Sequence, residues 1–170
     1  MNRTKQILKT ALGAGLPVPG ACRPIISGLY HFGVFATESL ILLRKILWIE
    51  PTLRSICDVG KGLRADRLPY IRGKGRLKIG DNVNLSGRSC FYFMSGSPVE
   101  PQIVVGDNVF IGNGCTLSAV KSIEIGSNVL VSTQVRIHDN DGPPVNSTRR
   151  KAGESAPYED AQPVVIEENA

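Results

Sequence analysis

The chain repeats the stretch Ile79-Gly80-Asp81-Asn82-Val83 at Val105-Gly106-Asp107-Asn108-Val109 and Ile125-Gly126-Ser127-Asn128-Val129, and in degraded form at Ile166-Glu167-Glu168-Asn169-Ala170. After each clean copy an apolar residue returns every six positions, namely Ile79, Leu85 and Phe91, then Val105, Ile111 and Leu117, then Ile125, Val131 and Ile137. A period of six suits neither a helix nor a lone strand, but it suits a chain that turns a corner every six residues. Three such sides make a triangular coil, so the sequence predicts an all-β solenoid.

The spacing between the copies supports this interpretation. Gly80 and Gly106 are 26 residues apart, and Gly106 and Gly126 are 20 apart; an 18-residue coil leaves short corner loops as the remainder. We expect the six-residue ladder to point inward and each Gly and Asn to occupy a tight or left-handed corner. The step from Ile125 to Ile166 is 41 residues, which predicts a long loop, at about residues 138–162. Loops of that length are often functional.

An antiparallel sandwich is the structural alternative, with the Gly-Asp-Asn segments as hairpin turns. It is disfavoured because sandwich strands vary in spacing. In addition, Asp-Asn-Val lacks the Asn-Gly or Asp-Gly that best closes a two-residue hairpin.

Composition sets broad limits on partners and compartment. Aromatic residues make up only 6% of the 170 residues, which suits a narrow solenoid interior. The four cysteines form no Cys-x-x-Cys pair, so we predict reduced thiols, no disulfide framework and no metal site. The net charge of +5 is compatible with anionic partners, but dispersed Lys and Arg more often solvate a surface, and we expect no nucleic-acid partner.

Residues 1–67 are predicted to be an N-terminal helical or capping segment, followed by the solenoid at 68–170. The first 24 residues imitate a signal peptide only superficially, because two prolines and several glycines interrupt the apolar region. We predict a helix from about Ala36 to Ile49, with Thr37 or Ser39 as its N-cap and Pro51 preventing continuation past Glu50. Its expected role is to cap the first coil. The alternative is peripheral membrane contact through residues 25–49.

Three further segments resemble a known family. They are Val135-Arg136-Ile137-His138-Asp139-Asn140-Asp141-Gly142-Pro143-Pro144-Val145 with the following Arg149-Arg150, then Ala161-Gln162-Pro163-Val164-Val165-Ile166, and upstream Leu68-Pro69-Tyr70-Ile71-Arg72-Gly73-Lys74-Gly75. Together with the hexads they make residues 68–170 similar to the hexapeptide-repeat O-acetyltransferases, such as the maltose, galactoside and polysaccharide-biosynthesis acetyltransferases.

This resemblance implies a left-handed parallel β-helix that forms a homotrimer. It also implies transfer of an acetyl group from acetyl-CoA to a hydroxyl of a sugar or glycan precursor. A hydroxyl is a poor nucleophile at neutral pH, so a neutral imidazole must accept its proton. Main-chain amides at the coil corners are then expected to stabilise the oxyanion. A cytoplasmic location, at the inner face of the membrane if residues 25–49 contact it, accompanies this assignment.

The catalytic base is where this chain departs from the family. Family members commonly place the base His in a Gly-His-Pro signature of the long loop, but here Pro143 occupies that position. The nearby substitute is His138, which follows inward Ile137 and should therefore point outward. Asp139 or Asp141 is expected to orient its imidazole. The expected acceptor-binding residues are Asp139, Asn140, Asp141 and Arg149.

The second departure is at the C-terminal end of the sequence. Family members continue past the position of Ala170 into Trp-Ile-Gly and further hexads, which build much of the CoA groove. Two hypotheses therefore remain at this point: an acetyl-CoA-dependent O-acetyltransferase, and a catalytically inactive β-helix scaffold or truncated relative of such an enzyme. A carbonic anhydrase on the same fold is disfavoured, because it needs three metal-binding histidines and the chain has two.

Overall fold

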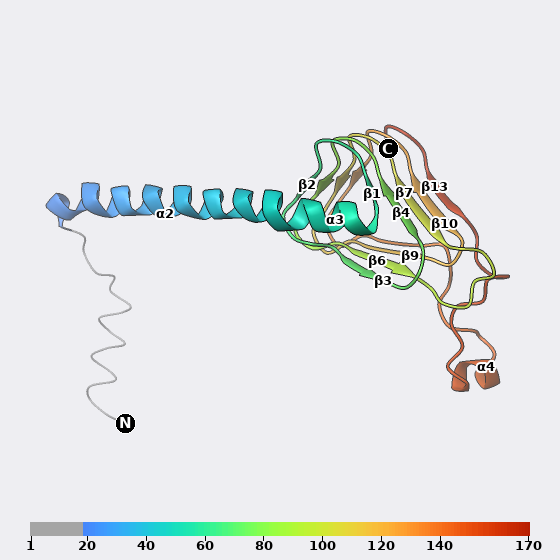
Figure 1. Cartoon of the computed structure of the whole chain (residues 1–170). Coiled ribbons are helices and arrows are strands. Elements are labelled where there is room, and N and C mark those ends of the chain that lie inside the picture. The colour runs from blue at the N-terminus through green and yellow to red at the C-terminus, as the bar shows by residue number, and fades with distance from the viewer. Residues whose placement is uncertain (1–18) are drawn as a thin grey trace, which may run out of the picture. The chain divides into compact units, whose positions relative to one another are not determined.

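The computed structural model describes residues 19–170, and the signal-peptide question therefore falls mostly outside the described part (Figure 1). The chain divides into two units after Ile41, which we treat separately. The helical elements are η1 (Gly20–Cys22), α2 (Arg23–Arg44), the π-helical η2 (Lys45–Ile49), α3 (Glu50–Ile56) and, within the long loop, α4 (Ser147–Lys151).

Helical structure is more extensive than the prediction for residues 36–49. It starts before Thr37, whose hydroxyl donates to the Gly33 carbonyl four residues earlier and therefore caps nothing. It also continues past Pro51, which was predicted to end it. Pro51 lies in the first turn of α3, where a missing N–H costs little. The preceding turn widens, with the Glu50 N–H donating to the Lys45 carbonyl in a π register.

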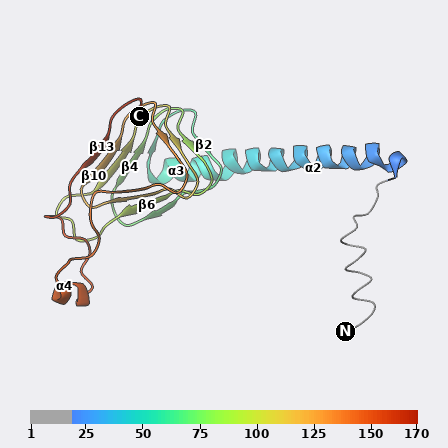
Figure 2. The ribbon, with the colours of Figure 1, turned by 180° about the vertical axis from the view of Figure 1, so that it is seen from behind.

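Within residues 19–170, thirteen strands form three parallel sheets. The stacked sheets can be followed in Figures 1 and 2. Sheet A contains β1 (Asp58–Val59), β4 (Arg76–Ile79), β7 (Gln102–Val105), β10 (Ser122–Ile125) and β13 (Val164–Ile166). Sheet B contains β2 (Arg64–Ala65), β5 (Asn84–Leu85), β8 (Phe110–Ile111) and β11 (Leu130–Val131). Sheet C contains β3 (Tyr70–Arg72), β6 (Cys90–Phe93), β9 (Thr116–Ala119) and β12 (Arg136–His138). Every third strand returns to the same sheet, which is a parallel β-helix-like solenoid and excludes the antiparallel sandwich.

The six-residue ladder forms the core of this solenoid. In sheet A, Ile79 pairs with Val105, Val105 with Ile125 and Ile125 with Ile166. Equivalent chains of partners run through Leu85, Ile111 and Val131 in sheet B and through Phe91, Leu117 and Ile137 in sheet C. The nine ladder residues of the three clean copies are at most 9% exposed. Apolar burial along the axis therefore stabilises the stack.

The solenoid begins at Asp58, ten residues before the predicted boundary at residue 68. Val59, Ala65 and Ile71 pair with Ile79, Leu85 and Phe91 and so make an additional first coil. This coil lacks the Gly-Asp-Asn stretch, because its corner reads Gly60-Lys61-Gly62. The six-residue spacing of Val59, Ala65 and Ile71 would have indicated it.

Asparagine and glycine occupy the corners as expected. Asn82, Asn108, Asn128 and Asn169 all have φ between 55° and 66°, a region that Asn tolerates better than most residues. Their side chains form a ladder, with Nδ2–Oδ1 distances of 3.2–3.3 Å from one coil to the next. Gly80 lies so close to the next coil that a β-carbon would be 2.7 Å from the main-chain carbonyl of Gly106.

The first coil is covered by the end of the helical segment. Ile49 and Leu53 are 1% and 0% exposed and belong to the same core cluster as the ladder residues. Arg54 ties α3 to the chain that follows it, donating to the carbonyl oxygens of Val59 and Gly60 at 2.7 and 2.9 Å. The capping contact thus comes from η2 and α3. Within residues 19–170, no helix combines the length and the hydropathy needed to cross a bilayer.

The inward ladder predicts that alanine substitution of two leucines will differ strongly in its effect on the free energy of unfolding. Leu117, fully buried in sheet C, and Leu130, 67% exposed in sheet B, differ mainly in burial. We expect Leu117→Ala to lower the free energy of unfolding by about 2–5 kcal/mol, because it leaves a cavity between stacked coils. Leu130→Ala should change it by less than about 0.5 kcal/mol. Urea unfolding of the two variants tests this, and equal losses would contradict the inward ladder.

Candidate functional site

The outer face of sheet C carries a row of polar side chains that ends at His138. In register, His138 pairs with Ser118, Ser118 with Tyr92 and Tyr92 with Arg72. Each position directly follows an inward ladder residue, so all four side chains project outward. His138 is exposed, as predicted, while Ser118 is only 7% exposed. Neighbouring strands lie about 4.8 Å apart, which places Tyr92 roughly 10 Å from His138. We call these four residues the sheet C row.

A pocket of about 470 Å³ opens beside this row. Both Arg72 and Tyr92 line it, together with Gly73, Phe93, Met94, Ser95 and Ser155. Partial burial, with Cys90 as a further contributor, raises the pKa of Tyr92, so its phenol stays protonated and able to donate a hydrogen bond at neutral pH. Arg72 and Tyr92 were not among the residues predicted from the sequence. Their place one residue after the ladder positions Ile71 and Phe91, like that of His138 after Ile137, would have identified them.

Asp139 anchors the long loop. It is 3% exposed, and its carboxylate accepts hydrogen bonds from the amides of Val120 at 2.8 Å and Lys121 at 2.6 Å. Its main-chain carbonyl also accepts from the Gln162 amide at 2.8 Å, at the far end of the loop. Because its carboxylate accepts hydrogen bonds from these amides, Asp139 has a structural role, and its predicted roles in orienting His138 and in binding the acceptor stay predictions.

A small second core reinforces this anchor. Val120, Ala156 and Ala161 are buried together, with Met94 and Tyr158 packed against them. Lys121 strengthens the contact, since its Nζ donates to the Ala161 carbonyl at 2.8 Å and lies 4.6 Å from the centre of the Tyr158 ring. The loop is therefore fixed to the third coil at both of its ends.

Asn140 and Asp141 occupy different environments. The Asn140 side chain donates to the Ser118 carbonyl at 3.3 Å and accepts from the Gly142 amide at 3.0 Å, so it closes a local turn. Asp141 is exposed at the tip of that turn. Pro143 is also exposed, next to buried Pro144. Asp141 thus remains available to a ligand, whereas the side chain of Asn140 is already used within the fold.

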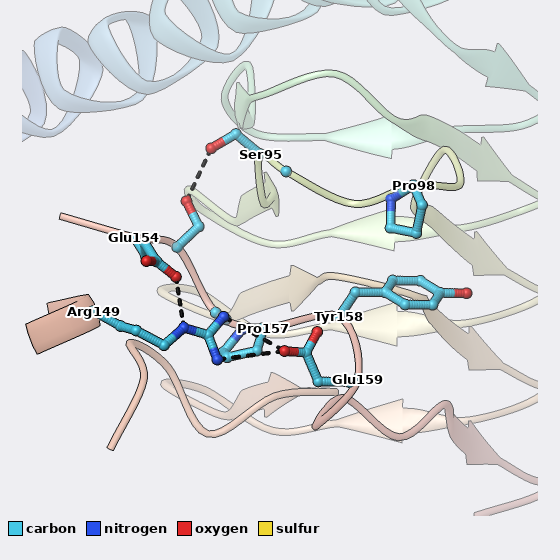
Figure 3. Close-up of a pocket in the computed structure, with 10 residues that line it drawn as sticks. Ser95, Pro98, Arg149, Glu154, Pro157, Tyr158 and Glu159 are labelled. Atoms are coloured by element: carbon cyan, nitrogen blue, oxygen red, sulfur yellow. Dashed lines mark hydrogen bonds and ion pairs between the residues drawn. The ribbon is translucent and has the colours of Figure 1, made fainter. Parts of the chain in front are cut away.

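Arg149 lies in a neighbouring pocket of about 350 Å³, shown in Figure 3. It follows the Asn146 cap of α4 and forms ion pairs with Glu154 at 2.7 Å and Glu159 at 3.4 Å. The hydrogen bond and charge of Glu154 raise the pKa of Arg149. A hydrogen bond from its own amide, followed by the charge of Arg149, lowers the pKa of Glu159. The guanidinium predicted to bind acceptor is thus neutralised from within the loop.

The two pockets meet where the long loop touches the 94–101 loop. Ser95 and Ser155 line both, and their hydroxyl oxygens are 2.9 Å apart (Figure 3). His138, Tyr92 and Arg72 are therefore brought to one face by the solenoid, and Arg149 lies across the Ser95–Ser155 contact from the larger pocket. The other histidine, His31, belongs to α2. Within residues 19–170, no group of three His, Cys, Asp or Glu side chains is placed to bind a metal.

Comparisons do not assign this site to a family. No protein-family model, curated protein or solved structure matches the chain. The functional argument therefore depends on the residues and their geometry.

The loop anchor generates a direct prediction. Asp139→Ala leaves the buried amides of Val120 and Lys121 without acceptors, and each unmet donor costs about 1–3 kcal/mol. We expect the loop to open more often and trypsin to cleave at Arg149, Arg150 or Lys151 roughly tenfold faster or more. Limited proteolysis measures this. Asp141→Ala, which removes an exposed carboxylate from the same loop, is the control, and equal cleavage rates in the two variants would contradict the anchor.

Proposed function

We propose that the chain is an acetyl-CoA-dependent O-acetyltransferase acting on a sugar or glycan-precursor hydroxyl, with His138 as its general base. The observation that carries the proposal is the position of His138. It is exposed at the end of the sheet C row, whose other end lines a pocket of about 470 Å³. An accessible imidazole on the same face as a concave surface with hydrogen-bond donors is the minimum that hydroxyl acylation requires.

The proposed reaction is a direct transfer. The acceptor hydroxyl oxygen attacks the thioester carbonyl while its proton passes to the His138 imidazole. The tetrahedral intermediate then collapses, the carbon–sulfur bond breaks, and the proton is returned to the leaving thiolate to give CoA thiol and an acetyl ester. Arg72 and Tyr92 are proposed to bind acceptor oxygens, since both present donors to the larger pocket. Asp141, exposed next to the strand end, is the remaining carboxylate for the acceptor.

The resemblance of residues 68–170 extends the proposal to the assembly. We infer a left-handed coil and a homotrimer whose neighbouring subunit completes the cleft in front of the sheet C row. A cytoplasmic location is part of the same proposal and agrees with four cysteines that are all free thiols. Acetyl-CoA would enter from the open side of this cleft.

A catalytically inactive scaffold is the second candidate, and one observation favours it. One of the two carboxylates predicted to orient the imidazole, Asp139, accepts hydrogen bonds from main-chain amides, and Arg149 is neutralised by Glu154 and Glu159. An imidazole without an orienting partner is a weaker base than one held in a fixed tautomer. Calorimetric titration with CoA separates the candidates, because a scaffold has no reason to bind it.

Removal of His138 tests the proposed base. We expect His138→Ala to lower the rate of acetyl transfer from acetyl-CoA to a sugar acceptor by about 10²–10⁴-fold, the usual contribution of a general base. CoA-thiol release across a panel of sugars is the measurement. His31→Ala, which removes the other histidine, should leave the rate unchanged. If the unmodified chain releases CoA thiol no faster than buffer does, the enzyme proposal is wrong. Full activity in His138→Ala would show that His138 is not the base.

Arg72 tests the placement of the acceptor. We expect Arg72→Ala to raise the KM for the sugar about tenfold or more, while the KM for acetyl-CoA changes little, because one charge-assisted hydrogen bond is worth about 1.5–3 kcal/mol. Arg64→Ala, which removes an exposed arginine from sheet B, is the matched control. Equal effects of the two substitutions would show that the larger pocket does not hold the acceptor.

A further inference from the structure

Helix α2 presents large apolar side chains around its whole circumference. Ten of its 22 residues are large apolar side chains that are at least half exposed: Ile25, Ile26, Leu29, Tyr30, Phe32, Phe35, Leu40, Ile41, Leu42 and Leu43. At 100° per residue, Leu29, Tyr30 and Phe35 point in widely different directions. A helix that is apolar on nearly all sides is stable only inside a core or in contact with lipid.

A narrow polar line runs along this apolar surface. Ser27, His31, Glu38 and Lys45 follow one another at steps of four, seven and seven residues, so they lie nearly above one another on the helix. Glu38 is the one acidic residue of α2. A helix lying in a membrane interface needs such a line to face water while its remaining surface is immersed.

The positive charge of the protein is concentrated in the same part of the sequence. Residues 1–49 contain six Lys and Arg residues and one Glu, whereas residues 50–170 contain 14 basic and 14 acidic residues. The whole net charge of +5 therefore belongs to the first 49 residues. This asymmetry is complementary to an anionic surface.

The end of the apolar segment has the residues that favour a lipid headgroup region. Arg44 and Lys45 are followed by Trp48, the single tryptophan of the chain, which is 61% exposed. Tryptophan and long cationic side chains prefer the membrane–water boundary, where an apolar body and a polar group are both satisfied. The next residue, Ile49, is 1% exposed and already part of the solenoid core.

We propose that residues 25–48 lie in the interface of an anionic phospholipid bilayer, with the polar line toward water. This inference is independent of the proposed acyl transfer. Pairing of α2 with a second copy explains the exposed surface less completely, because two helices bury one stripe each and would leave either Leu29 or Phe35 in water. Pairing of two copies also gives no reason for the concentration of positive charge in the first 49 residues.

Trp48 supplies a direct readout of this contact. With vesicles containing about 30 mol% phosphatidylglycerol in phosphatidylcholine, we expect a blue shift of its emission and co-sedimentation of the full chain. Replacing these vesicles by pure phosphatidylcholine, or raising the salt from 0.1 to 0.5 M, should weaken partitioning at least tenfold, because both remove the attraction between opposite charges. Arg44→Gln combined with Lys45→Gln should also weaken it about tenfold or more.

Two leucine substitutions provide the matched comparison. Leu40 is 66% exposed on α2 and Leu130 is 67% exposed on the solenoid, so each change to Asp adds one negative charge at an exposed site. Leu40→Asp should reduce partitioning tenfold or more, and Leu130→Asp should not. Equal binding of both variants, absence of any Trp48 shift, or undiminished binding to pure phosphatidylcholine would overturn the proposal. A further contradicting result would be a blue shift of Trp48 emission without lipid that grows with protein concentration and is lost in Leu40→Asp. That result would identify a second copy of the chain as the partner.

Discussion

The structure depends on stacking each residue of a coil directly on the equivalent residue of the next coil. Where the corners of two paired coils approach each other, no space is left for a side chain. At Gly80, a β-carbon would lie 2.7 Å from the Gly106 carbonyl. The same corner needs positive φ two residues later, which Asn82 provides at 55°. Gly-Asp-Asn is therefore repeated because the backbone, rather than a ligand, requires it. The Asp81 amide and the Asp107 carboxylate then join neighbouring coils at 2.7 Å.

That stacking rule also creates the candidate site. Because strands in a sheet are in register, any residue that follows an inward ladder position lies on the outer face in line with its equivalents. Arg72, Tyr92, Ser118 and His138 come together for this reason. The long loop then forms a wall beside the sheet C row, which the coils alone do not provide. Its anchor is a buried carboxylate, Asp139, together with the small core around Val120.

The prediction succeeded where one local rule determined the structure. The inward ladder, the corner asparagines, the pairing of Ile125 with Ile166 and the outward position of His138 all follow from the six-residue period. The prediction was wrong where two local rules competed. Pro51 was expected to end the helix, but the π turn before it removes the conflict. The first coil was missed because Gly60-Lys61-Gly62 satisfies its corner without the recurrent motif.

Sequence by itself determined the solenoid, because a backbone that turns every six residues records its geometry in the order of Gly, Asn and apolar residues. It also located the positive charge in the first 49 residues. Only the tertiary structure decided which polar side chains are available to a ligand. Asp139 and Asp141 are two residues apart and have the same side chain, yet one is buried against main-chain amides and the other is exposed. The difference arises from the amides of residues 120 and 121, which reach Asp139 through the pairing of adjacent coils.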